Sequence, residues 1–210
     1  MNRIKELSVS SLDHLPSLQL LDLDHQLTPL VIRDQAFNKQ TNLTRLVLGS
    51  NRKLQLEPRA FEGLVLDLSH NHIGVLGFKS FSGLPQLQTL LLTDNAIAHL
   101  GIPASLPKKL DLSSNALTHI RNDTIPADLQ TLDLSDNFIA EPQSHIFSSL
   151  QSLDLSLNRF HCGPGLRDLV SWMRQTNVTL KGPVEKLRCE FPSALRGVPL
   201  VTVYGADDAQ

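Results

Sequence analysis

Leucines recur along the chain in pairs separated by one residue, and an asparagine follows most pairs after two intervening residues. The aligned segments include LTRLVLGSN, LQTLLLTDN, PKKLDLSSN and LQTLDLSDN. The asparagines in this slot are Asn51, Asn71, Asn95, Asn115, Asn137 and Asn158. Gln26 fills the first slot, and the steps along the series are 25, 20, 24, 20, 22 and 21 residues. Such a period predicts a repeat architecture in which each unit forms one turn of the chain.

The order of leucines within each unit predicts what that turn looks like. Alternate side chains of a strand face the same side, so Leu46 and Leu48 should point inward while Val47 points outward. One unit cannot bury its leucines alone, so neighbouring units stack as parallel strands. The period and the pattern match leucine-rich repeats. We therefore predict an α/β solenoid, a leucine-rich-repeat horseshoe with a parallel β-sheet on its concave side.

The asparagine slots have a structural explanation. After each strand the chain turns inward, which places backbone N–H and C=O groups in the interior without a sheet partner. An asparagine side chain has two donors and one acceptor on a short stem, so it can bond the turn of its own repeat and of the next. We predict that the six asparagines named above form a ladder of buried hydrogen bonds.

The repeat pattern ends after Phe160, and a different kind of segment follows. Leu166, Leu169, Val170 and Met173 have helical spacing, which predicts an amphipathic helix in a C-terminal cap. The pattern divides the chain into a partial, uncapped N-terminal repeat at 1–17, about seven repeats at 18–160 and the cap at 161–210.

Both cysteines lie in the cap region. Cys162 precedes the expected helix and Cys189 follows it, so a disulfide would close a span of 27 residues around that helix. Two buried free thiols are the alternative.

The N-terminal segment lacks the features of a complete terminal repeat. Residues 1–17 contain no cysteine and no apolar run typical of a signal peptide, and no stretch of the chain approaches the length of a membrane span. Two explanations stay open: the chain is part of a longer receptor, or a partner covers the edge.

Composition and motifs exclude several classes of function. Lys and Arg number 19 against 21 Asp and Glu, so there is no basic excess to attract nucleic acid. Catalytic motifs such as G-x-S-x-G and H-E-x-x-H are absent, and we expect neither an enzyme nor a cofactor. His99 and His119 occupy equivalent slots of adjacent repeats and could bind a metal or respond to pH. Without a third ligand, exposed polar side chains are the favoured interpretation, and we predict no metal site.

Two sets of surface residues are candidate sites. The outward positions of the strands carry a column of carboxylates that could receive a basic or polar protein surface: Asp22, Asp67, Asp111, Asp133 and Asp154. The alternative is that these aspartates only keep the concave face hydrated. Sequons for N-glycosylation occur at Asn42, Asn122 and Asn177.

The C-terminal segments resemble a known family. FHC, LVSWMRQTNVTL and LRCEFPSALRGVPL resemble the cysteine-rich C-terminal cap of Toll-like receptor ectodomains, and residues 84–208 are similar to the last repeats of flagellin-sensing members. The family cap usually has two disulfides, whereas this chain lacks both partners of one of them. The resemblance implies an innate immune receptor at the cell surface that pairs with a second receptor chain and senses a protein ligand, with bacterial flagellin as one candidate. It also implies that this part of the receptor serves capping and receptor approach more than primary ligand binding.

Two other functions compete with the receptor hypothesis. One is a soluble, secreted leucine-rich-repeat binder or decoy that competes with a full receptor. The other is a structural leucine-rich-repeat scaffold in the cytosol or matrix, with reduced thiols. The redox state of the cysteines distinguishes a cytosolic protein from the extracellular alternatives.

Overall fold

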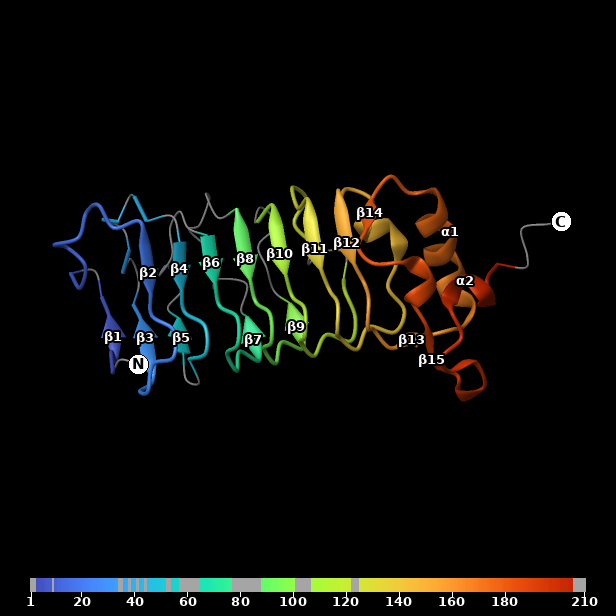
Figure 1. The fold of residues 1–210 in the computed structure, drawn as a ribbon, viewed down its shortest axis with the longest axis horizontal. Coiled ribbons are helices and arrows are strands. Elements are labelled where there is room, and N and C mark those ends of the chain that lie inside the picture. Colours follow the sequence, from blue (N-terminus) through green and yellow to red (C-terminus); the bar gives the residue numbers. More distant parts are fainter. Residues whose placement is uncertain are drawn as a thin grey trace.

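The chain winds into a solenoid with two rows of short strands on different sides, and helical segments gather at its C-terminal end (Figure 1). The computed structural model describes residues 3–8, 10–33, 36–37, 39–40, 42–43, 45–51, 54–56, 65–76, 88–100, 107–121 and 125–205.

The first row is an eight-stranded, wholly parallel sheet whose strand order follows the chain. Its strands are β2 (Leu20–Asp22), β4 (Arg45–Val47), β6 (Val65–Asp67), β8 (Thr89–Leu91), β10 (Lys109–Asp111), β11 (Thr131–Asp133), β12 (Ser152–Asp154) and β14 (Thr179–Leu180). The central leucines pair in register, for example Leu110 with Leu132 and Leu132 with Leu153. The predicted solenoid with a parallel sheet is confirmed. We call the outward side of this sheet, the predicted concave side, the sheet face.

The second row of strands follows the inward turns and was not predicted. It comprises β1 (Glu6–Leu7), β3 (Leu30–Ile32), β5 (Leu54–Leu56), β7 (Val75–Leu76), β9 (His99–Leu100), β13 (Phe160–His161) and β15 (Cys189–Phe191), in three small parallel sheets. Leu30 and Ile32 are fully buried with Val31 between them half-buried, so the same alternation builds this wall. The core therefore lies between two rows of strands.

The central leucines of the strands from β4 to β12, and the leucines two residues after them, are buried. Leu46, Leu48, Leu132 and Leu134 have no exposed surface, as the alternation predicted. Val47 is half-buried and lies on the sheet face. A Leu-to-Leu stack of this kind excludes water along the length of the solenoid and is its main source of stability.

The asparagines bond the inward turns to one another. Asn115 is a representative member: its Nδ2 donates to the carbonyls of Leu92 and Leu112 at 2.9 and 3.0 Å, and its Oδ1 accepts from the N–H of Ile97 at 3.0 Å. Each amide thus links its own turn to the preceding one. The same pattern holds at Asn51, Asn71, Asn95, Asn137 and Asn158.

Short helices close the C-terminal end. They are the 3-10 helices η2 (Ser144–Phe147), η3 (Pro164–Leu166), η4 (Val184–Lys186) and η5 (Ser193–Leu195), and the α-helices α1 (Arg167–Gln175) and α2 (Leu200–Val203). α1 buries Leu169, Val170 and Met173, which matches the expected amphipathic helix.

A disulfide and a tyrosine tie this end together. Cys162 and Cys189 are bonded, with Cα atoms 5.6 Å apart, so the free-thiol alternative does not apply. The Tyr204 hydroxyl donates to the Gly163 carbonyl at 2.7 Å and so fastens the chain after α2 beside the disulfide. Burial raises the pKa of this hydroxyl, against a lowering by Arg167.

Candidate functional site

The five candidate aspartates share one row of the sheet face. Strand pairing places them in the order Asp22, Val47, Asp67, Leu91, Asp111, Asp133 and Asp154 across the sheet. Two apolar residues interrupt the row, and three carboxylates follow one another at its C-terminal end. Neighbouring strands are about 4.8 Å apart, so these three form a compact acidic surface.

Each aspartate of the row also has a local structural role. Oδ1 of Asp111 accepts from the N–H and the hydroxyl of Ser113, at 3.0 and 2.7 Å, and Asp133 does the same with Ser135. Asp22, Asp67 and Asp154 accept from the N–H two residues on. One oxygen of each carboxylate therefore fixes the exit from its strand, which explains why aspartate suits this position without any ligand.

The other oxygen of one of these carboxylates has a basic neighbour from the cap. Nζ of Lys181, which follows β14, lies 4.0 Å from Oδ2 of Asp133, at the cap end of the row. Hydroxyl residues flank the row on the same face, among them Thr93, whose Oγ1 accepts from Ser113 at 3.2 Å. The arrangement is polar, acidic and held by backbone pairing, which suits recognition of a basic or hydroxyl-rich protein surface.

The three sequons differ in what the structure shows. Asn42 is exposed and its Nδ2 donates to the Pro16 carbonyl at 3.2 Å. Asn177 is exposed at the turn between α1 and β14, and Thr179 of its sequon is exposed as well. Asn122 lies outside the described residues.

Several histidines each face one other histidine or one carboxylate. The rings of His99 and His119 lie with their centroids 5.9 Å apart, as their equivalent slots predicted. His70 faces Asp94 at 2.9 Å and His161 faces Glu141 at 2.7 Å, both exposed. Within the described part of the chain, no group of three or more His, Cys, Asp or Glu side chains could hold a metal ion.

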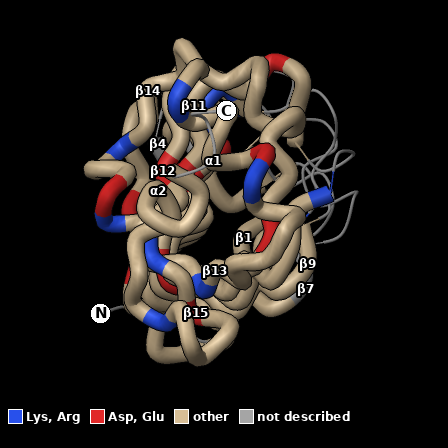
Figure 2. The backbone as a smooth tube through the Cα atoms, turned by 90° about the vertical axis from the view of Figure 1, so that its right-hand side faces the viewer, with Lys and Arg blue, Asp and Glu red and all other residues tan. Residues whose placement is uncertain are grey.

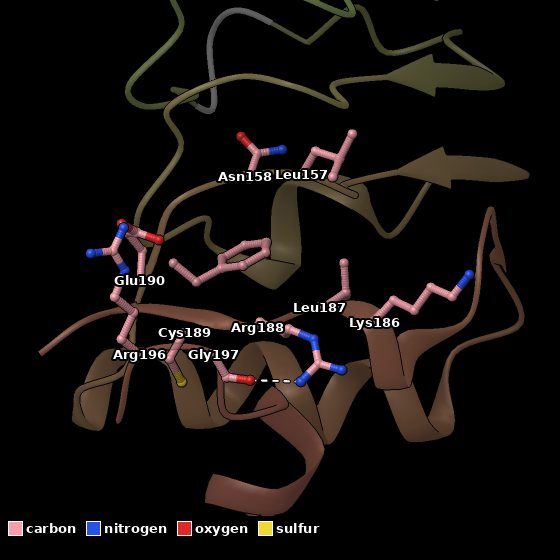
Figure 3. Close-up of a pocket in the computed structure, with 10 residues that line it drawn as sticks. Leu157, Asn158, Lys186, Leu187, Arg188, Cys189, Glu190, Arg196 and Gly197 are labelled. Atoms are coloured by element: carbon pink, nitrogen blue, oxygen red, sulfur yellow. Dashed lines mark hydrogen bonds and ion pairs between the residues drawn. The ribbon is translucent and has the colours of Figure 1, made fainter. Parts of the chain in front are cut away.

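A second polar surface lies in the cap, and the sequence analysis missed it. A pocket between the last repeat and the cap is lined by Lys186, Arg188 and Arg196 on one side and Leu157 on the other (Figure 3). Seen from the cap end, basic backbone positions lie close to β13 and β15 (Figure 2). The signal was present in the segment EKLRCEFPSALRG and in LSLN, where a leucine precedes the ladder asparagine.

Two segments of the chain match family models described as leucine rich repeat, at residues 64–97 and 128–150. The chain belongs to the leucine-rich-repeat proteins. This fold builds receptors and scaffolds, so the domain is a recognition module rather than an enzyme. No helix among the described residues is long and apolar enough to cross a membrane.

Two proteins are similar to this leucine-rich-repeat domain over nearly its whole length. It is similar over its full length to Toll-like receptor 5 of Homo sapiens, with 31% identity over 221 residues, which is 23% of that receptor. Trophoblast glycoprotein of Macaca fascicularis is 27% identical over 234 residues, which covers 98% of this chain and 51% of that protein. The domain therefore spans about a quarter and about half of these relatives.

A solved structure supports the same fold. The structure of the Toll–Spatzle complex from Drosophila superimposes with a TM-score of 0.70 and 23% identity, covering 95% of this chain and 30% of that one. The resemblance of the sequence to Toll-like receptors is thus shown by the match to Toll-like receptor 5, which covers all of this chain and 23% of the receptor. The likeness to Toll shows that the two chains share a fold.

Proposed function

We propose that this domain is a protein-recognition module of an innate immune receptor ectodomain, of the Toll-like receptor 5 kind, and that it contributes to receptor pairing and ligand sensing. The proposal rests on the full-length similarity to Toll-like receptor 5. The Toll neighbour is described in complex with Spatzle, a protein ligand, which favours a protein partner here too. Bacterial flagellin is the ligand to test first.

The acidic row is the proposed contact surface. Asp111, Asp133 and Asp154 hold three carboxylates side by side, with one oxygen of each used by its own turn. A partner would bring Lys, Arg or hydroxyl groups to the second oxygens of Asp111 and Asp154, while that of Asp133 has Lys181 of this chain at 4.0 Å. The disulfide between Cys162 and Cys189 favours an extracellular or cell-surface location for the receptor, or secretion of the domain by itself.

The test uses purified monomeric flagellin and the whole chain in biolayer interferometry. The triple variant Asp111→Asn, Asp133→Asn and Asp154→Asn keeps an acceptor for each turn and removes three charges. It is made in bacteria and refolded, because all three substitutions create Asn-Leu-Ser sequences that a secretory pathway would glycosylate. The matched control is Asp128→Asn with Asp168→Asn, two exposed aspartates outside the row.

We expect weak flagellin binding by the native chain and at least about tenfold weaker binding by the triple variant. The control should stay within about twofold. Sedimentation equilibrium of the native chain with and without flagellin then reports pairing. Absence of binding at roughly 100 µM flagellin would refute the flagellin assignment, and equal affinity of both variants would refute the row as the contact surface.

A second function has specific support from the trophoblast glycoprotein match, which covers nearly the whole chain. In that case the domain is a secreted or surface leucine-rich-repeat binder or scaffold that acts without a flagellin ligand. The two functions predict different results for flagellin binding and for association of the chain. A binder of this class leaves flagellin untouched and leaves the chain monomeric in its presence, whereas the receptor hypothesis requires both flagellin binding and association.

A further inference from the structure

Seven inward turns of the solenoid share one backbone conformation, and one of them carries an unexpected residue. The residue before each ladder position has a positive φ, between 48° and 58°. These residues are His25, Ser50, His70, Asp94, Ser114, Asp136 and Leu157. Six are the polar residues His, Ser or Asp, and Asp and His are enriched in the left-handed region. Leu157 has φ 58°, the largest of the series, and its side chain is 75% exposed.

An exposed leucine in this conformation is unfavourable for the isolated chain on two counts. The left-handed region crowds its Cβ against the backbone, and its apolar surface is left in water. The six equivalent turns show that the fold accepts a polar residue there. Leu157 therefore serves something other than the solenoid's own packing.

Leu157 stands at the rim of the cap pocket (Figure 3). The pocket has a volume of about 260 Å³, and the buried side chains of Phe160 and Leu187 contribute to its lining. The apolar part of the pocket is thus continuous with the exposed leucine at its edge. A space of this size accepts a small number of side chains from a partner.

The polar part of the pocket is positively charged. Lys186, Arg188 and Arg196 line it against a single carboxylate, Glu190, whereas the whole chain carries a formal charge of −2. Glu190 pairs with Arg196 at 2.8 Å. Two cations remain for a ligand.

The guanidinium of Arg188 is held in place for such a ligand. Its Nη1 donates to the Gly197 carbonyl at 2.6 Å, which leaves its other donors for an acceptor in the pocket. Among the residues that the structure describes, neither Arg188 nor Lys186 has an ion-pair partner. Arginine in such a setting binds carboxylates through two parallel hydrogen bonds.

We propose that this pocket is a docking site for a segment of a partner protein in which an acidic side chain lies next to an apolar one. The carboxylate meets Arg188 and Lys186, and the apolar side chain packs on Leu157 and over Phe160. The apolar rim favours a polypeptide over a simple anion, which would use only the cations. The site is separate from the acidic row of the sheet face and opposite to it in charge, so the two surfaces take different partners.

The test uses the whole chain, labelled with ¹⁵N and with its disulfide intact, and two synthetic peptides. The probe is acetyl-Gly-Leu-Glu-Leu-Glu-Gly-amide, and its control has Gln in place of both Glu. Leu157→Asn removes the apolar anchor and suits the left-handed backbone, so the variant should fold at least as well as the native chain. Leu27→Asn, at a leucine of the first turn that is 60% exposed, is its control. Arg188→Gln is compared with Lys108→Gln, an exposed lysine outside the pocket.

We expect the Glu peptide to bind with a dissociation constant of roughly 0.1 to 1 mM and to shift the amide signals of Leu187 and Gly197. Leu157→Asn and Arg188→Gln should each weaken binding at least about fivefold, with both controls within about twofold. The aspartate triple variant of the sheet face should bind the peptide like the native chain. Equal binding of the Gln peptide, equal binding of inorganic phosphate at the same signals, unchanged affinity of the two pocket variants, or no binding at several millimolar peptide would each overturn the proposal.

Discussion

At the N-terminal end of the ladder Gln26 fills the slot that asparagine fills elsewhere, whereas at the C-terminal end Asn158 is followed by a disulfide-bonded cap. Oε1 of Gln26 accepts from the N–H of Ile4 at 3.2 Å, and its Nε2 donates to the Leu23 carbonyl at 3.2 Å. The longer side chain thus reaches back to the segment before the first full turn. Around it, Leu20 and Leu27 are 53% and 60% exposed.

The C-terminal end is closed by several elements at once. β14 pairs with β12, and the N–H of Lys181 donates to the Leu153 carbonyl at 2.8 Å. The N–H of Cys162 donates to the Phe191 carbonyl at 2.7 Å, beside the disulfide. The solenoid therefore ends in two ways. The first turn is held by the Gln26 side chain and the pairing of β1 with β3, and the last by backbone pairing, helix packing and a covalent bond. Stability should be concentrated at the capped end.

The largest effect is expected when the disulfide of the cap is removed. We expect Cys162→Ala with Cys189→Ala to lower the free energy of unfolding of the cap by about 3 kcal/mol, because the unfolded chain regains the freedom of the loop that the bond closes. Urea unfolding, with amide hydrogen exchange of α1 and β10, measures the effect and its location.

Amide hydrogen exchange should increase in α1 at a lower urea concentration than in β10, because the cap loses its disulfide while the asparagine ladder stays intact. Equal protection of α1 in both proteins would contradict the idea that the disulfide stabilises this end. The native chain with its disulfide intact is the reference in both measurements.

A smaller effect is expected in the middle of the ladder, where both ends are distant. Asn137→Ala leaves the N–H of Leu117 without a partner in a buried turn. It also removes one of two ladder donors from the carbonyls of Leu112 and Leu134, which keep Asn115 and Asn158. This should lower the free energy of unfolding by about 1 to 3 kcal/mol. Asn42→Ala, at an exposed asparagine, should cost less than about 0.5 kcal/mol. Equal midpoints in urea for the two variants would count against the structural role of the ladder.

The periodic part of the fold was predictable from residue spacing. Leucines two residues apart lie on the same side of a strand, and an asparagine at a fixed distance after them lies in the same turn of each repeat. The spacing alone therefore predicted the burial of Leu132 and Leu134 and the ladder role of Asn137. The cap helix was also predictable, because Leu169, Val170 and Met173 have the spacing of residues on one face of a helix. These predictions succeeded because each depends on local geometry that every repeat reproduces.

The remaining features depend on contacts between repeats. The second row of strands was missed because the pairing of Val31 with Gln55 needs two turns in register, which no single segment reveals. The row of aspartates was predicted as a surface, but the use of Asp111 Oδ1 by Ser113 emerges only from the turn geometry. Leu157 was overlooked because a leucine beside an asparagine repeat looks like core. Its exposure follows from the left-handed turn that places it outside.

The smallest expected effect is at the N-terminal end and concerns the length of one side chain. Gln26→Asn keeps the amide but shortens its stem by one methylene, so Oε1 no longer reaches the N–H of Ile4. We expect a loss of about 1 kcal/mol, because that N–H lies in a partly buried position and its replacement partner is water. The amide exchange of Ile4 should rise while that of Leu132 is unchanged. If Ile4 keeps its protection, the segment before the first turn is held by β1 and β3 pairing alone, and the two ends of the ladder differ less than the geometry of Gln26 implies.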